Sequence, residues 1–270
     1  MSTGVFREIL ETTSILAKNR RILVATTRVE LAKRYSGSIL GMLWVPLFPV
    51  LFLSVYLFVY LVIFKMKFPG YSQLDYVVYV FCGLVPYIGF MESVNSGCHA
   101  IKQNIHLVKN VMLPIELVPV RYVLSSMVAQ LVGMGVLLLL VALNGSLSLH
   151  LTWLPILMIL QIAFLVGLVW ILAGLAVVVP DISYFVNLMT LLLVFISPIG
   201  FKPDMVPSGL SFMVDMNPIY YMLEVFRYSL FYGGFPPLHI GLPYVLMCLV
   251  SFGLGAVFFR RFRNILVDYE

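Results

Sequence analysis

The chain has 270 residues, of which 61% are hydrophobic and only 11% are charged. Soluble domains have roughly 45–50% apolar and about 25% charged residues. With a mean hydropathy of +1.03, the chain has too few charges to cover a water-soluble surface. The composition therefore indicates a polytopic membrane protein and excludes a soluble enzyme, a nucleic-acid binder and a disordered scaffold. The net charge of +5 comes from basic residues that flank apolar stretches, where we expect them to set topology and contact anionic headgroups.

The N-terminal segment 1–41 is basic, and apolar residues recur at helical spacing over residues 5–34. This pattern predicts one or two amphipathic helices in the cytoplasmic interface, with their cations toward the headgroups. The alternative is a basic tail that only enforces topology. The segment lacks the apolar core and cleavage site of a signal peptide, so we do not interpret it as one.

A membrane-spanning helix needs about 20 apolar residues. Six stretches qualify, at about 42–64, 76–97, 118–143, 153–179, 184–201 and 240–259. The apolar pieces of 203–232 are too short to span, and they predict a re-entrant pair of short helices on the periplasmic side. The expected fold is an all-α integral membrane protein. It has an N-terminal interface helix, one six-helix transmembrane domain over 42–260 and a cytoplasmic tail at 261–270.

Orientation follows from the distribution of Lys and Arg at the ends of the spans. Thirteen of the 17 basic residues lie in the N-terminal segment, the connection between the second and third spans, and the C-terminal tail. We therefore expect both termini in the cytoplasm, which an even number of spans requires.

The chain lacks the sequence signatures of catalysis. No P-loop, HExxH or GxSxG motif occurs, and the four histidines and three cysteines are scattered. Glu92, near the cytoplasmic end of the second span, is the acidic residue closest to a membrane interior. We expect no catalytic residue, metal site or cofactor in this chain, so a partner must supply the driving energy.

Aromatic residues recur at every fourth position of the first span: Trp44, Phe48, Phe52, Tyr56, Tyr60 and Phe64. Each step of four advances about 400°, so the series winds slowly around the helix. Aromatic faces suit the C–H surfaces of sugars, and this series is the candidate lining of a substrate channel. The alternative is ordinary packing with aromatic belts at the two interfaces.

The connection between the second and third spans reads as a short helix over about 99–113, because Ile101, Ile105 and Val108 share one helical face. A helix that protrudes into the cytoplasm suits docking of a soluble motor, although an ordinary connecting helix fits the pattern equally well. Its candidate contact residues are Lys102, Asn104, His106 and Lys109. On the outer side, Glu224 and Arg227 are three residues apart and can therefore pair on a helix. This pair would either close a gate or act as structural glue, that is, only stabilise the packing.

Several motifs resemble bacterial polysaccharide-export permeases. They occur at residues 34–49 (RYSGSILGMLWVPLFP), 83–87 (GLVPY), 104–114 (NIHLVKNVMLP), 179–182 (VPDI), 197–199 (SPI) and 217–219 (NPI), followed by Arg227. These landmarks cover about residues 28–230 in the family's order. Such permeases are the membrane subunits of type-2 ABC exporters for O-antigen, capsule or teichoic acid. One departure is Pro180, which stands before Asp181 where the family often has Arg.

The resemblance implies a homodimer in the bacterial inner membrane with two separately encoded ATPase subunits, which hold ATP and Mg. It implies a coupling helix at 99–113, gate helices at 203–232 that include Asn217, Glu224 and Arg227, and transport of an undecaprenyl-diphosphate-linked polysaccharide, with O-antigen favoured. Membrane lipids are the other expected partners, and no nucleic acid is expected. The diphosphate would meet Arg28, Lys33 and Arg34, unless these residues are only topology anchors.

Two alternatives remain. One is an exporter of the same superfamily for a small molecule such as a drug or haem. The other is an integral-membrane enzyme acting on lipid-linked sugars. An enzyme needs a cluster of catalytic groups at the membrane face, and the only grouped acids, Asp204, Asp215 and Glu224, lack metal-like spacing.

Overall fold

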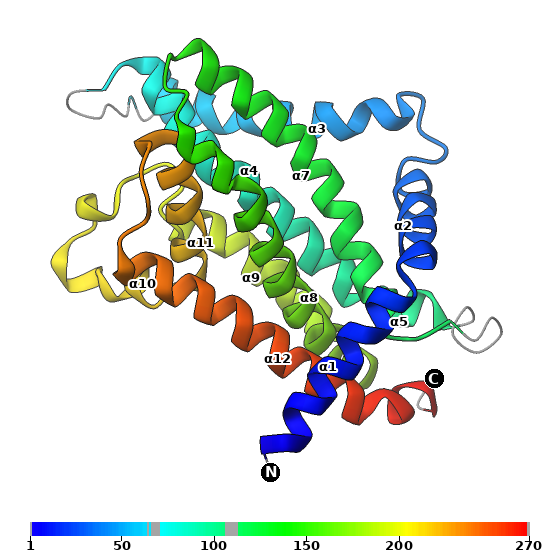
Figure 1. Cartoon of the computed structure of the whole chain (residues 1–270). Coiled ribbons are helices and arrows are strands. Elements are labelled where there is room, and N and C mark those ends of the chain that lie inside the picture. Colours follow the sequence, from blue (N-terminus) through cyan, green and yellow to red (C-terminus); the bar gives the residue numbers. More distant parts are fainter. Residues whose placement is uncertain (1, 64, 66–70, 106–112, 269–270) are drawn as a thin grey trace.

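The computed structural model describes residues 2–63, 65, 71–105 and 113–268, and all regular structure in those ranges is helical. The all-α prediction is confirmed (Figure 1). The predicted site residues Phe64, His106 and Lys109 lie outside the described residues, as does the side chain of Tyr60.

Five helical stretches are long and apolar enough to cross a membrane. They are Gly41–Ile63, Gln73–Cys98, Leu117–Leu143, Leu149–Val178 and Leu238–Arg263. They match the first, second, third, fourth and sixth predicted spans. The first consists of α3 (Trp44–Leu57) between a 3-10 turn and a π-helical segment (Phe58–Ile63). The others contain α4 (Gln73–Cys98), α7 (Leu117–Leu143), α8 (Leu154–Val178) and α12 (Leu238–Asp268).

The predicted fifth span is shorter than expected. Helix α9 (Ile182–Ile196) has 15 residues, which gives about 22 Å against roughly 30 Å of hydrocarbon. The helix ends just before Ser197-Pro198 because a proline disfavours helical geometry at the residue before it. Within the described ranges there are thus five helical stretches of spanning length and one shorter apolar helix, and the count of six full spans is not confirmed.

The region predicted as a re-entrant pair contains several short elements. Two 3-10 turns precede α10 (Phe212–Asp215), and α11 (Pro218–Arg227) continues into a π-helical turn at Tyr228–Tyr232. Helix α11 packs against α4 and α12. Insertion of this region into one leaflet stays a prediction.

Helix α4 occupies the centre of the bundle, since 83% of its most apolar stretch is buried, against 18% for the first span. Helices α8 and α12 approach each other at two glycines. A Cβ on Gly167 would lie 2.1 Å from the Ser251 carbonyl oxygen, and one on Gly255 would lie 2.2 Å from the Gly167 carbonyl oxygen. Only glycine permits this backbone contact, which is how small residues bring membrane helices together.

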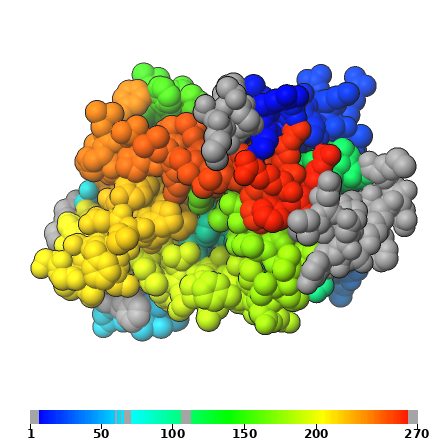
Figure 2. Space-filling model, turned by 90° about the horizontal axis from the view of Figure 1, so that it is seen from below, coloured from blue at the N-terminus to red at the C-terminus, as the bar shows by residue number. Residues whose placement is uncertain are grey.

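The N-terminal segment forms two helices, α1 (Ser2–Lys18) and α2 (Arg20–Arg34), as the amphipathic pattern predicted. Helix α1 packs against α12, and α2 packs against α7. In Figure 2 the dark-blue atoms of α1 border the red atoms of α12. Both termini lie at the end of the bundle that carries the one-turn helix α5 (Ala100–Gln103). We call this the terminal end.

Candidate functional site

The aromatic residues of the first span differ in their surroundings. Phe48 is 38% exposed, and its ring stacks on that of Phe52 with centroids 6.1 Å apart. Trp44 lies at the start of the span, where its Nε1 donates to Ser38 Oγ at 2.9 Å. Tyr56 is buried against the bundle. The series therefore turns from the surface into the core, as the slow winding predicts, and its role in lining a channel stays a prediction.

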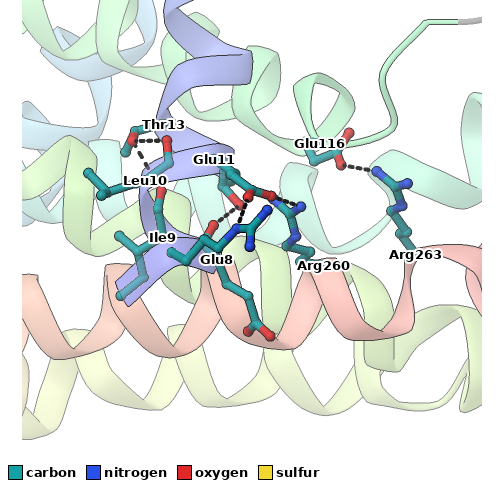
Figure 3. A network of polar contacts seen from close by, with 10 residues as sticks. Glu8, Ile9, Leu10, Glu11, Thr13, Glu116, Arg260 and Arg263 are labelled. Atoms are coloured by element: carbon teal, nitrogen blue, oxygen red, sulfur yellow. Dashed lines mark hydrogen bonds and ion pairs between the residues drawn. The ribbon is translucent and has the colours of Figure 1, made fainter. Parts of the chain in front are cut away.

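At the terminal end, five ion pairs join different helices, and we call this set the ion-pair belt. Arg260 pairs with Glu11, Arg261 with Glu8 at 3.5 Å, Arg263 with Glu116 at 3.5 Å, Arg121 with Glu30 at 3.6 Å, and Arg34 with Glu92 at 2.9 Å. Figure 3 shows the contacts of Glu11 and Glu116 with α12. The belt fastens α1 to α12 and α2 to α7 and α4. The sequence analysis treated these arginines as topology signals, and Arg34 also as a candidate contact of the diphosphate, but it did not consider the acidic residues of α1 and α2 as their partners.

The belt separates the three residues predicted to meet a diphosphate. At 100° per residue, Lys33 and Arg34 are turned about 140° and 240° from Arg28 around α2. Arg34 points inward to Glu92, whereas Arg28 and Lys33 are exposed on different sides of the helix. The structure therefore does not bring Arg28, Lys33 and Arg34 together in one site.

The predicted coupling segment contains the single turn α5. Asn104 follows it and is buried, with Nδ2 donating to the Ala100 carbonyl and to the Tyr122 hydroxyl, each at 2.8 Å. Lys102 is exposed. Asn104 thus holds the turn against α7, and Lys102 is the described residue of the predicted set that a soluble partner can reach.

At the opposite end, the three predicted gate residues meet at the break after α9. Arg227 is completely buried, and its Nη1 lies 2.7 Å from Glu224 Oε1. Its Nη2 donates to the carbonyls of Pro198 at 2.6 Å and Ile199 at 2.9 Å. Asn217 caps α11 by accepting from the Ile219 amide, and its Nδ2 donates to Ser197 Oγ at 2.9 Å.

The break after α9 frees carbonyl groups that no helix satisfies, and a buried unsatisfied carbonyl is costly. The Arg227 guanidinium satisfies two of them and lies 3.8 Å over the Tyr79 ring. Gly83 leaves the necessary space, since a Cβ there would lie 3.0 Å from Nη2. The predicted pairing of Glu224 with Arg227 is confirmed, and its role as a gate stays a prediction.

Sequence reasoning missed a polar pair inside the bundle. Gln130 in α7 and Gln161 in α8 exchange two hydrogen bonds of 2.7 and 3.0 Å, and Gln161 Nε2 also donates to the Pro86 carbonyl at 3.0 Å. The sequence did contain a signal for this pair, because uncharged amide side chains in apolar spans also indicate interhelical contacts.

The break held by Arg227, the short α9 and the first four stretches of spanning length lie within one matched region, whereas α12 follows it. The family described as ABC-2 type transporter matches residues 22–231. The chain belongs to this family. It is thus a multi-pass membrane protein of the transporter class, as the resemblance predicted. The matched region of this ABC-2 family member runs from α2 to the π-helical turn after α11.

Three similar proteins carry names that are consistent with this family. The chain is 27% identical over 220 residues to the O-antigen export system permease protein RfbA of Myxococcus xanthus. The aligned region covers 80% of this chain and 82% of that protein. It is also 27% and 26% identical to two proteins of the same name from Klebsiella pneumoniae, over 79% of this chain and 81% of each relative.

Proposed function

We propose that this chain is the membrane-spanning permease subunit of an ATP-driven exporter of O-antigen polysaccharide. The observation that carries the proposal is the family match over residues 22–231, together with three relatives named as O-antigen export permeases that align over about four-fifths of the chain. We expect the substrate to be a polysaccharide linked to undecaprenyl diphosphate, and the location to be the bacterial inner membrane.

ATP hydrolysis is assigned to partner subunits because the sequence has no P-loop. The exposed Lys102 and the rest of segment 99–113 are the proposed docking point for these subunits. The terminal end carries most of the basic residues, which favours a cytoplasmic position for it and for both termini. ATP and Mg would bind the partner, and this chain would need no cofactor of its own.

A second copy of the chain is the proposed partner within the membrane. The first span is largely unburied, and α9 presents large exposed side chains, among them Tyr184 at 75% and Phe195 at 64%. Two copies that met along these faces would enclose a path between them, with Phe48 and Phe52 available to line it. Because exposed apolar side chains also face lipid in any membrane protein, their apolar character alone does not indicate a dimer. The support for a dimer is the large extent of these exposed faces.

The test combines two measurements. The tagged chain is purified in mild detergent and assayed for an associated ATPase, which we expect to co-purify near one to one. In cells that lack the chain, surface O-antigen should disappear while its lipid-linked precursor accumulates inside. If no ATPase accompanies the chain, the motor-driven mechanism is wrong. If the ATPase is present but O-antigen export is unchanged, only the substrate is wrong, and a small-molecule exporter becomes the better interpretation.

A further inference from the structure

The side of α2 that faces away from the bundle carries a basic hollow. Arg20, Arg21, Val24, Ala25 and Arg28 line this concavity of about 400 Å³. Their spacing places all five within about 140° of one another around the helix. We call this feature the arginine groove.

The opposite side of α2 fixes the direction in which the groove faces. Leu23 and Thr27 are buried there, Glu30 pairs with Arg121 of α7, and Arg34 pairs with Glu92 of α4. These contacts hold the helix at two points along its length and prevent rotation about its axis. In Figure 1, α2 stands at the rim of the molecule beside α7. The arginine groove is therefore an outward-facing surface of the docked helix.

The charge of the groove is not compensated within the described part of the chain. The sequence contains ten arginines. Seven of them form ion pairs: Arg7, Arg34, Arg121, Arg227, Arg260, Arg261 and Arg263. The other three are Arg20, Arg21 and Arg28, for which the described residues provide no carboxylate within ion-pair distance. Among the described residues, the three arginines without a counterion thus share one hollow.

The groove also lies close along the chain to the first stretch of spanning length. The first span begins at Gly41, seven residues after the end of α2 at Arg34. Exposed apolar side chains accompany the arginines, including Val24 in the groove and Val29, which is 66% exposed, on another side of the helix. A helix with exposed cations and exposed apolar residues next to a span is placed where headgroups meet acyl chains.

We propose that the arginine groove binds the phosphate of an anionic phospholipid from the leaflet at the terminal end. Guanidinium groups form paired, charge-assisted hydrogen bonds with phosphate oxygens, and three of them around one hollow supply both the charge and the donors. The other two lining residues, Val24 and Ala25, have apolar side chains that do not compete with the phosphate for hydrogen bonds. The bound lipid would supply the counterions that the protein lacks here and would stabilise α2 in its place against α7. This site is independent of the exported substrate.

The test measures lipid binding to the purified full chain by native mass spectrometry, with phosphatidylglycerol and phosphatidylcholine as probes. The variant R20Q/R21Q/R28Q removes the groove cations. The matched control K18Q/K33Q/K102Q removes three positive charges from exposed residues that do not line the hollow. Because hydrogen bonds from guanidinium groups to a phosphate are charge-assisted and depend on direct contact, we expect the groove variant to lose about 10- to 100-fold in phosphatidylglycerol affinity. The control should change it less than about threefold.

Circular dichroism and size-exclusion profiles check that the variants are folded. The variant R20K/R21K/R28K keeps the charge and should retain intermediate affinity. Equal losses in the groove variant and its control would overturn the proposal, because net charge alone would then explain binding. The proposal is also overturned if the groove variant loses undecaprenyl diphosphate and keeps phosphatidylglycerol, since the site would then serve the carrier lipid. Either result leaves the proposed export function intact, because that function is tested by the co-purified ATPase and by surface O-antigen.

Discussion

Arg34 and Glu92 are 58 residues apart in the chain, and the Nη1 of Arg34 lies 2.9 Å from the Oε2 of Glu92. The contact joins the end of the interface helix α2 to the central helix α4, and Arg34 Nη2 also reaches Ser126 of α7 at 3.4 Å. Both charged side chains are about one-fifth exposed. This ion pair connects the N-terminal helices directly to the most buried element of the bundle.

Glu92→Gln should lower the stability of the chain in detergent by about 1–2 kcal/mol, because Arg34 keeps its charge in a half-buried place without its carboxylate. Adding Arg34→Gln should recover part of this loss, and a double-mutant cycle on thermal or denaturant unfolding measures the coupling. Arg7→Gln is the control, since the Arg7–Glu11 pair is exposed and its loss should have little effect. Additive single and double effects would show that the pair contributes nothing.

Glu224→Gln should destabilise the chain by about 3–5 kcal/mol, because it removes the carboxylate that pairs with the completely buried Arg227. Glu224→Asp keeps the charge and should cost less. Unfolding in detergent and surface O-antigen are measured together. Lost export with lost stability supports structural glue, whereas changed export at unchanged stability supports a gate.

Gly89→Ala should displace the Gln130 side chain, since a Cβ at position 89 would lie 1.8 Å from Gln130 Oε1. Overpacking of this kind costs about 1–3 kcal/mol, and the pairing with Gln161 would be lost as well. Gly135→Ala on the same helix as Gln130 is the control, because nothing lies within 4 Å of its added Cβ. Unfolding midpoints of the two alanine variants give the comparison, and equal midpoints would contradict the predicted clash.

Phe48→Ala/Phe52→Ala should slow export without preventing assembly with the ATPase, if the stacked and partly exposed rings line the path. Leu139→Ala removes an exposed apolar side chain of α7 and serves as the control. The readouts are surface glycan and the amount of co-purified ATPase. Normal surface glycan in the double variant would refute the lining role. Tyr56 is left unchanged because it is buried.

Acid should loosen α1 from α12. The hydrogen bond from Arg7 holds the pKa of Glu11 below its ordinary value, and Arg260 acts in the same direction. Because Arg7 lies on α1 itself, only the part of the lowering that Arg260 causes stabilises docking, and this part is present above the ordinary pKa of Glu11. That contribution is lost as the pH falls through the lowered value. Spin labels on α1 and α12 should therefore separate in acid. Glu11→Gln should remove this response, and an unchanged response in that variant would assign it to another group.

Most of the spans could be predicted from the sequence. Stretches near Val78, Val123 and Leu165 are apolar for 20 residues or more, and such a stretch in lipid must satisfy its own backbone by forming a helix. The amphipathic spacing of α1 and α2 and the three-residue spacing of Glu224 and Arg227 could also be recognised, because each pattern depends only on residues close together in the chain. The family landmarks are also local in sequence, and the match to the ABC-2 transporter family confirms the membership that they implied.

Tertiary structure decided which charges are paired and how the break after α9 is satisfied. Glu11 and Arg260 are 249 residues apart, so their contact depends on how whole helices dock and rotate, which no local pattern specifies. The break after α9 depends in turn on Arg227, because the freed carbonyls of Pro198 and Ile199 are acceptable only with a buried donor beside them. The composition and apolar spacing of this chain determine a helical membrane protein. The pairing of its arginines is a long-range property, and it leaves Arg20, Arg21 and Arg28 facing outward together.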